Sequence, residues 1–238
     1  MSEHTEPDRA FDLTSALAEA ARTINRPRSV EETLQAIAST ARRSIPGFDH
    51  VGISLMHADG KIETKAATDD LVLRLDSLQY GLNEGPCVSS LREQPMLVVD
   101  HLAHQQRWPR FVPEAVKLGL RSQMALRLYV DDEGTMGGIN LYSTSSDTIS
   151  DDAPAAAQVF AAQAAVALGR AQEVDQLNEA LRSRQQIGTA LGIIIERYKL
   201  DEQAAFNFLA RLSSLSNVKL RDIAARVVED AAKARDST

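Results

Sequence analysis

A long stretch without proline towards the end of the chain constrains the fold most. From Ala155 to about Tyr198 there is no proline, and only Gly169, Gly188 and Gly192 interrupt residues that favour helix. One helix over ~44 residues would extend roughly 65 Å at 1.5 Å per residue, several times the average helix length in globular proteins. Such a length without a stop signal is typical of a helix that pairs with another helix.

Apolar residues give this helix a candidate seam. They recur at spacings of three and four over three heptads, with Arg184 and Gly188 interrupting them: Val174, Leu177, Leu181, Leu191 and Ile195. This spacing is typical of a two-helix coiled coil. We therefore expect a parallel homodimer, and the alternative is that the stripe packs within one subunit.

The composition is that of a soluble, core-forming protein. Of the 238 residues, 44% are hydrophobic and 25% are charged, which argues against a disordered chain and fits one large or two modest domains. Cys87 is the only cysteine, which excludes an intrachain disulfide and a cysteine-based zinc site. The polar first residues lack the apolar core of a signal peptide, and no apolar run approaches the ~18 residues of a membrane span. We expect a cytoplasmic protein.

Charge is distributed unevenly along the chain. The net charge of −7 argues against a protein that coats nucleic acid with its whole surface. From Gln176 to Arg235, ten Lys and Arg residues stand against seven Asp and Glu, a balance of +3, so the remainder carries −10. An acidic body with a mildly basic tail segment indicates local contact with nucleic acid.

Apolar spacing and a capping-box pattern predict helices in the first part of the chain. Phe11–Ile24 carries apolar residues at roughly helical spacing. Ser29 and Glu32 form a capping-box pattern, in which the Ser29 hydroxyl accepts from the Glu32 N–H and the Glu32 carboxylate reaches back. An apolar helical stripe follows and ends at Pro46 and Gly47; it contains Val30, Leu34, Ile37, Ala38, Ala41 and Ile45.

The middle of the chain predicts an antiparallel sheet. Val51–His57 and Lys61–Ala67 are expected to form a hairpin around Asp59 and Gly60, since Asp-Gly readily adopts the positive φ of a tight turn. Further strands are expected at Met96–Val99, Gln123–Val130 and Gly137–Ser143, the last two flanking a polar turn at 131–135, and helices at Leu71–Tyr80 and Phe111–Leu118. Helices around a hairpin-rich middle indicate an α+β domain.

Two shorter helices are expected after the long one. Asp201 can cap the first, which ends in a turn at Ser213–Asn217, and the second covers Lys219–Ala231. The core-facing residues are expected to be Ala204, Ala205, Phe208, Leu209 and Leu212 on the first, with Phe206 on a neighbouring face, and Leu220, Ile223, Ala224, Val227 and Val228 on the second. Helices this short must fold back on the long helix to bury these faces.

Three motifs in this region resemble the helices of an ANTAR domain. Leu181–Arg197 (LRSRQQIGTALGIIIER) resembles the first-helix signature, Ala204–Ser213 (AAFNFLARLS) the second helix and Asn217–Val228 (NVKLRDIAARVV) the third. The stretch Leu177–Ala232 is therefore identified as an ANTAR domain. The resemblance implies a three-helix domain that binds paired stem-loops in nascent mRNA leaders and prevents terminator formation. Leu191 stands where such domains commonly carry lysine, so a phosphate contact that this lysine could make is not expected here.

Upstream motifs resemble the GAF domains that actinobacteria fuse to ANTAR domains. They span roughly Ala10–Leu168 and comprise Gly85-Pro86-Cys87, Asp100, Arg107–Phe111, Gly119–Ser122 and Gly138–Ser143. The resemblance implies a sensory GAF fold joined by a helix to the RNA-binding tail. We expect a flexible N-terminus at residues 1–9, the GAF domain at 10–170, and the ANTAR domain at 171–234 with its first helix continuous with the last GAF helix.

The candidate RNA contacts lie within the ANTAR-like motifs. Basic side chains contact phosphates electrostatically, and polar side chains can recognise bases exposed in hairpin loops. The basic candidates are Arg182, Arg184, Arg211, Lys219 and Arg221, and the polar ones are Gln185, Thr189 and Ser213. Each is alternatively a solvated surface residue, and Arg184 on the seam can instead form an ion pair with the second subunit.

Aromatic residues are scarce in the tail. Tyr198, Phe206 and Phe208 are the only ones after Phe160. We therefore expect recognition through shape and hydrogen bonds more than through base stacking.

Other reactive side chains have simpler interpretations. Cys87 is expected to be a small residue at the start of a helix after Gly-Pro, since no motif ties a histidine to it. His101 and His104 lack a third metal ligand, and Trp108 is expected to anchor a loop on the core. The acidic clusters 131–133 and 151–152 are expected to be a solvated turn and a helix start. We expect no metal and no resident cofactor, and the GAF ligand is unidentified.

These observations predict a homodimeric transcription antiterminator whose GAF domain senses a small molecule or a partner protein. One alternative is a DNA-binding regulator that uses the last two helices, although the second of them also carries Asp222, Glu229 and Asp230. Another is a ligand-sensing interaction dimer without nucleic-acid binding. An enzyme is not expected, since no nucleophile, base and orienting group can be assembled from the sequence.

Overall fold

The computed structural model describes residues 22–24, 29–57, 59–129 and 136–236. The helix expected at Phe11–Ile24 falls largely outside these residues, as does the turn expected at 131–135. The chain divides into two compact units, Met1–Gln172 and Glu173–Thr238, and each is described by itself.

A five-stranded antiparallel sheet forms the centre of the first unit. The strands are β1 (His50–Met56), β2 (Ile62–Ala67), β3 (Met96–Val99), β4 (Ser122–Tyr129) and β5 (Met136–Ser143), in the order β2-β1-β5-β4-β3. At the β1–β2 turn the Gly60 N–H donates to the His57 carbonyl at 2.8 Å, with Gly60 at φ +80°. The expected strands and the antiparallel α+β arrangement are confirmed.

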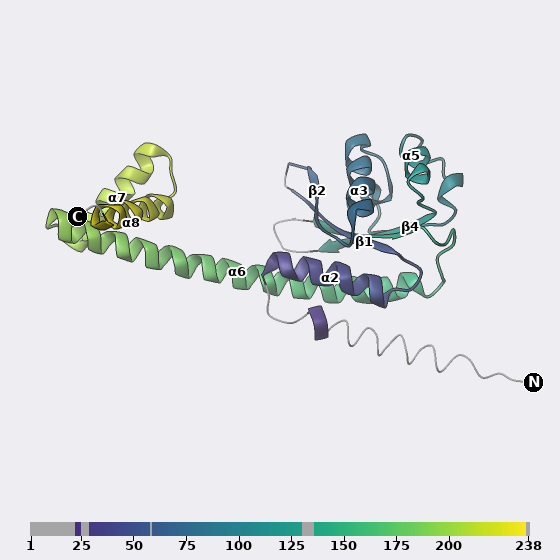
Figure 1. Cartoon of the computed structure of the whole chain (residues 1–238), viewed down its shortest axis with the longest axis horizontal. Helices are drawn as coiled ribbons and strands as arrows, with labels where there is room; N and C mark the ends of the chain where they lie inside the picture. Colours follow the sequence, from purple (N-terminus) through teal and green to yellow (C-terminus); the bar gives the residue numbers. More distant parts are fainter. Residues whose placement is uncertain (1–21, 25–28, 58, 130–135, 237–238) are drawn as a thin grey trace, which may run out of the picture. The chain divides into compact units, whose positions relative to one another are not determined.

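Helices cover both faces of the sheet, as Figure 1 shows. On one face lie α2 (Val30–Ser44) and the beginning of α6 (Ala153–Tyr198). On the other lie α3 (Asp70–Leu82), α4 (Pro86–Arg92) and α5 (Phe111–Lys117), and the short 3-10 helix η1 spans Leu102–His104. The uninterrupted α6 confirms the long helix expected from the absence of proline.

The capping box at the start of α2 is present as expected. The Glu32 N–H donates to Ser29 Oγ at 3.2 Å, and the Ser29 N–H donates to Glu32 Oε2 at 3.1 Å. The two bonds satisfy backbone donors that the first turn would otherwise leave free. The helix buries the predicted stripe, including Leu34, Ile37 and Ala41.

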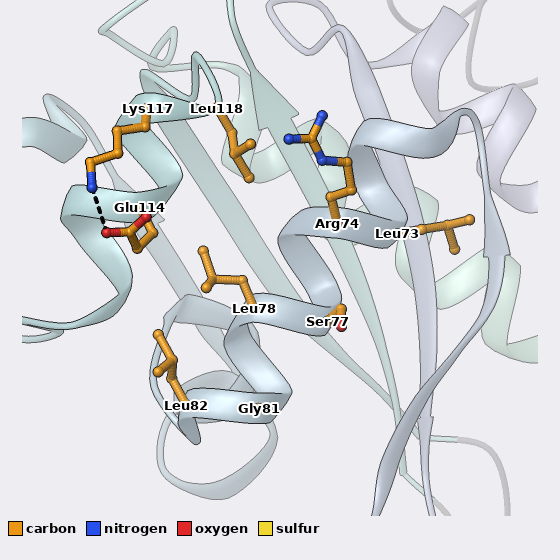
Figure 2. Close-up of a pocket in the computed structure, with 9 residues that line it drawn as sticks. All are labelled: Leu73, Arg74, Ser77, Leu78, Gly81, Leu82, Glu114, Lys117 and Leu118. Atoms are coloured by element: carbon orange, nitrogen blue, oxygen red, sulfur yellow. Dashed lines mark hydrogen bonds and ion pairs between the residues drawn. The ribbon is translucent and has the colours of Figure 1, made fainter.

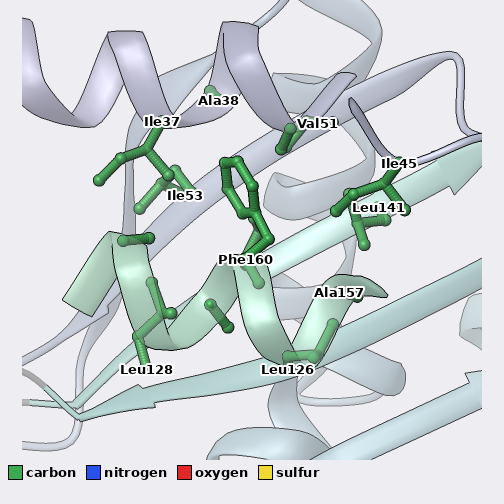
Figure 3. Close-up of a cluster of buried hydrophobic side chains, with 14 of the residues drawn as sticks. Ile37, Ala38, Ile45, Val51, Ile53, Leu126, Leu128, Leu141, Ala157 and Phe160 are labelled. Carbon is green, nitrogen blue, oxygen red and sulfur yellow. The ribbon is translucent and has the colours of Figure 1, made fainter. Parts of the chain in front are cut away.

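Phe160 of α6 fills the core between the two helices and the sheet. It is 1% exposed and, as Figure 3 shows, it lies among aliphatic side chains of α2, β1, β4 and β5. The strands reach this core by alternation: Val51 and Ile53 of β1, for example, face it while Ser54 faces the opposite side. This packing fixes α6 against the sheet.

The second unit is a three-helix fold. The end of α6, α7 (Glu202–Ser216) and α8 (Leu220–Asp236) share a core of Ala190, Ile194, Ala205, Leu209, Ile223 and Ala224. Asp201 Oδ1 accepts from the Ala204 N–H at 2.7 Å, which confirms the predicted cap of α7.

Two expectations for α7 are wrong. Phe208 and Leu212 were expected in the core, but they are 42% and 37% exposed, because Ala205 and Leu209 already fill the contact with the other helices. The turn expected at Ser213–Asn217 begins only at Asn217, where φ is +53°, since α7 continues to Ser216.

Candidate nucleic-acid interface and sensor site

Four of the five basic side chains predicted to bind RNA are exposed, and Arg197 and Arg226 of the second unit are exposed as well. Arg182 and Arg184 lie on α6, Arg211 lies on α7, and Lys219 directly precedes α8. None of them forms an ion pair or hydrogen bond with another of the described residues, and Gln185 is likewise exposed. Their positive charges are therefore available to phosphate groups.

Three other residues predicted to bind RNA are already engaged within the unit. Thr189 Oγ1 donates to the Gln185 carbonyl at 3.0 Å, one turn back on α6. Ser213 Oγ donates to the Val218 carbonyl at 2.6 Å and so bridges the connection between α7 and α8. Arg221 forms an ion pair with Glu179, and its Nε lies 3.8 Å from Asp222 Oδ1. The hydroxyl hydrogens of Thr189 and Ser213 are thus used within the unit, and the charge of Arg221 is offset by Glu179.

The predicted dimer seam is exposed at one end and covered at the other. Val174, Leu177 and Leu181 are 51%, 63% and 56% exposed. Leu191 and Ile195, in contrast, pack partly buried against the three-helix core of the same chain. Only the first three therefore present an uncovered apolar stripe.

Two aromatic side chains meet on the surface of the second unit, which sequence reasoning did not foresee. The rings of Tyr198 and Phe208 lie with centroids 6.0 Å apart at an angle of 42°. Tyr198 is 56% exposed, and Phe206, on another side of α7, is 41% exposed. The pairing depends on how α7 folds back beside the end of α6, and no local sequence signal reports it.

In the first unit, the face of the sheet under α3 and α4 holds a buried polar cluster. Asp76 of α3 is fully buried and accepts hydrogen bonds from Thr64 Oγ1 at 2.6 Å, from Asn140 Nδ2 at 3.3 Å and from the Tyr142 hydroxyl. Gln79 Nε2 donates to the same tyrosine oxygen at 3.0 Å. Burial raises the pKa of Asp76 to about 6, against the lowering effect of these hydrogen bonds.

Cys87 belongs to this cluster and is fully buried. It lies at the start of α4 after Gly85 and Pro86, which confirms its expected position. Its N–H donates to Gln79 Oε1 at 2.9 Å, and Asn140 Nδ2 donates to its Sγ at 3.1 Å. Burial, followed by the nearby Asp76 carboxylate, raises the pKa of the thiol to about 12, so it stays protonated and unreactive.

A surface groove of about 690 Å³ lies between α3 and α5, as Figure 2 shows. Lys117 Nζ is 2.7 Å from Glu114 Oε1 at its edge. Four leucines line it together with charged and small residues: Leu73, Arg74, Ser77, Leu78, Gly81, Leu82, Glu114, Lys117 and Leu118. It is separate from the buried cluster around Asp76.

The remaining candidates have structural roles. The rings of His101 and His104 are stacked with centroids 6.0 Å apart, and the described residues contain no group of three or more His, Cys, Asp or Glu that could hold a metal. Trp108 is 4% exposed and its Nε1 donates to Ser89 Oγ at 3.1 Å, so it anchors its loop as expected. None of the described helices is long and apolar enough to cross a membrane.

Family models identify both units. A GAF domain model matches residues 27–169, more than half of the chain, and an ANTAR domain model matches residues 175–228. The chain belongs to the GAF and ANTAR regulators. ANTAR domains are RNA-binding antitermination modules and GAF domains are signal-sensing, non-catalytic domains. The GAF–ANTAR protein thus combines a sensory module with a module of an RNA-binding family. A comparison with curated proteins found no match.

Solved structures similar to the GAF–ANTAR protein support the fold. The photosensory core module of the Stigmatella aurantiaca phytochrome matches 90% of this chain and 47% of its own, with 14% identity and a TM-score of 0.61. The chain therefore spans about half the length of that module.

Two further structures each match about 70% of the chain. CepR2, an N-acylhomoserine lactone dependent LuxR family transcription factor from Burkholderia cenocepacia, matches 69% of this chain and 99% of its own, with 19% identity and a TM-score of 0.56. The GAF domain of a phosphoenolpyruvate-protein phosphotransferase from Coxiella burnetii matches 70% and 98%, with 14% identity and a TM-score of 0.55. At these identities the likeness concerns the fold alone.

Proposed function

We propose that the GAF–ANTAR protein is a signal-responsive transcription antiterminator that binds paired stem-loops in nascent mRNA leaders. The observation that carries the proposal is the set of unpaired, exposed arginines Arg182, Arg184 and Arg211 within the ANTAR match at residues 175–228. Lys219 adds a fourth cation that has no ion pair within the described part of the chain, and Gln185 adds a polar group that can hydrogen-bond to a loop base. The protein acts in the cytoplasm, where nascent mRNA is made, and catalyses no reaction.

The protein works as a parallel homodimer in this proposal. Val174, Leu177 and Leu181 are each at least half exposed on one stripe of α6, and a second copy would cover them. Two ANTAR domains, one per subunit, then match the two hairpins of a paired stem-loop. The partly buried Leu191 and Ile195 continue the same stripe but contribute mainly to the fold of the ANTAR domain.

Residues 1–9 precede the GAF domain at 10–170, and the ANTAR domain follows at 171–234. A small molecule or a partner protein is sensed by the GAF domain, and α6 carries the signal because it runs without interruption from the sheet to Tyr198. A signal shifts the dimer between two arrangements only to the extent that it binds them with different affinity. Asn140 Oδ1, buried in the polar cluster and without a partner among the described residues, offers one acceptor to a small ligand.

Binding of a double-hairpin leader RNA tests the proposal. In a gel shift at fixed salt, the intact protein should bind, and the Arg182→Ala, Arg184→Ala, Arg211→Ala triple variant should bind much more weakly with a shallower dependence on salt. A matched control is Arg221→Ala, because that side chain is already paired with Glu179. Equally weak binding by the wild type and the triple variant would refute RNA recognition by this face.

Duplex DNA of equal length is the competitor in the same assay, at the same salt concentration. RNA should displace the labelled probe at much lower concentration than DNA does. Preference for the DNA would instead support a DNA-binding regulator that uses α7 and α8.

A further inference from the structure

The C-terminal unit exposes an aromatic pair that its own fold does not need. Its core is closed by Ala190, Ile194, Ala205, Leu209, Ile223 and Ala224. The rings of Tyr198 and Phe208 lie outside this core, 56% and 42% exposed, with their centroids 6.0 Å apart. Two exposed aromatic rings held together at the surface present flat apolar faces on which a planar ligand can stack.

The charges around the pair favour a polyanion as the occupant. Arg211 lies three residues after Phe208 and therefore on the same side of α7, exposed and without an ion pair among the described residues. Lys199 and Asp201, the nearest charges to Tyr198 on its C-terminal side, are engaged with Glu196 and with the Ala204 N–H. A free cation beside exposed ring faces is the combination that holds single-stranded nucleic acid, where bases stack on rings and phosphates meet the cation.

We propose that Tyr198 and Phe208 form a stacking platform for unpaired bases in the loops of the RNA hairpins. Arg211 contacts the phosphate next to the stacked base. The inference rests on the proposed RNA binding and adds to it how the loop bases are held: by stacking on two aromatic rings, in addition to hydrogen bonds from polar side chains. Base stacking was expected to contribute little to RNA recognition because the tail has few aromatic residues. The inference replaces that expectation, since Tyr198 and Phe208 lie side by side in the folded unit.

Equilibrium titration of the intact protein with a double-hairpin RNA tests the platform. The variants are Phe208→Leu and Tyr198→Leu, which keep an apolar side chain but remove the flat ring. The matched control is Phe206→Leu, since Phe206 is of the same type, 41% exposed and two residues away on another side of α7. All three side chains lie outside the core, so each variant should keep the wild-type thermal unfolding midpoint.

Stacking on an aromatic ring contributes about 1–3 kcal/mol per base, which corresponds to roughly fivefold to a hundredfold in affinity. We expect losses in this range for Phe208→Leu and Tyr198→Leu and none for Phe206→Leu. The salt dependence of binding should be unchanged in all three, since no phosphate contact is lost, whereas Arg211→Ala should make it shallower. A 2-aminopurine placed in the loop should be quenched on binding to the wild type and less so with Phe208→Leu.

Three results would overturn the platform. If Phe208→Leu and Tyr198→Leu bind as the wild type does while the triple arginine variant is weakened, the platform is refuted and the proposed function stands. If sedimentation shows that Phe208→Leu dissociates the dimer, the rings form an interface between copies. If the wild type does not bind the RNA at all, both the platform and the proposed function fail.

Discussion

The buried carboxylate of Asp76 should make the stability of the GAF domain depend on pH. Its partners are neutral: Thr64, Asn140 and Tyr142 all donate to it, and no cation pairs with it among the described residues. Burial therefore dominates and raises its pKa from 3.8 to about 6. The raised pKa of Cys87 keeps that neighbouring group neutral throughout this range.

The sign and size of the effect follow from linkage. A raised pKa means that the folded state binds the proton more tightly, so the contribution of Asp76 to stability is greatest below pH 4 and falls as the pH rises through about 6. A shift of about two pKa units corresponds to about 3 kcal/mol of unfolding free energy. Asp76→Asn keeps the shape but cannot ionise: its amide oxygen can still accept from Asn140 and Tyr142, and the Thr64 hydroxyl can rotate to accept from its NH2. The variant should therefore lose this fall and exceed the wild type at neutral pH.

Urea denaturation between pH 4 and pH 8 measures the effect. Trp108, the only tryptophan, is buried in the GAF domain and reports its unfolding by fluorescence. Asp49→Asn is a control of opposite sign. Partial burial raises the pKa of Asp49, but hydrogen bonds from Ser145 and Thr144 together lower it by more, so the pKa is below its usual value. The stabilisation that the Asp49 carboxylate contributes is therefore lost as the pH falls. Parallel pH profiles for the wild type and Asp76→Asn would refute the account of this cluster.

Three further changes test the packing and the seam. Phe160→Ala should lower the unfolding free energy of the GAF domain by about 3–5 kcal/mol in urea denaturation, since it opens a cavity under α2, and a loss below 1 kcal/mol would contradict that packing. Gly85→Ala should lower the unfolding free energy by about 1–3 kcal/mol through backbone strain alone, because the φ of residue 85 is +124°. The loss should be larger still because the added Cβ would lie 2.4 Å from Gln79 Oε1, and an unchanged melting temperature would contradict this. Leu177→Lys with Leu181→Lys should convert the dimer to a monomer in analytical ultracentrifugation while the GAF domain stays folded, whereas a variant that stays dimeric would exclude the seam.

Local signals in the sequence predicted most of the fold. The Ser29 and Glu32 capping box, the Asp59-Gly60 turn and the proline-free stretch each act within a few residues or along one helix, so their outcome does not depend on distant partners. The core face of α7 was only partly predicted. Its apolar stripe is broader than the contact available to it, and small Ala205 lets the helices approach so closely that Phe208 remains outside.

The buried polar cluster had no signal in the sequence. Asp76 and Asn140 are 64 positions apart, and only the antiparallel pairing of β1 with β5 brings them together beneath α3. The same limit applies to the RNA candidates. Arg221 pairs with Glu179 across 42 positions, so the sequence could not show that it differs from the unpaired Arg182 and Arg211.

Crosslinking the protein to RNA in cells and sequencing the bound fragments tests the central claim most directly. The account predicts that fragments are enriched at paired stem-loops upstream of terminators, and that the enrichment is lost in the variant with alanine at Arg182, Arg184 and Arg211. Recovery of the same fragments with the wild type and the variant, or of no RNA above background with either, would contradict it.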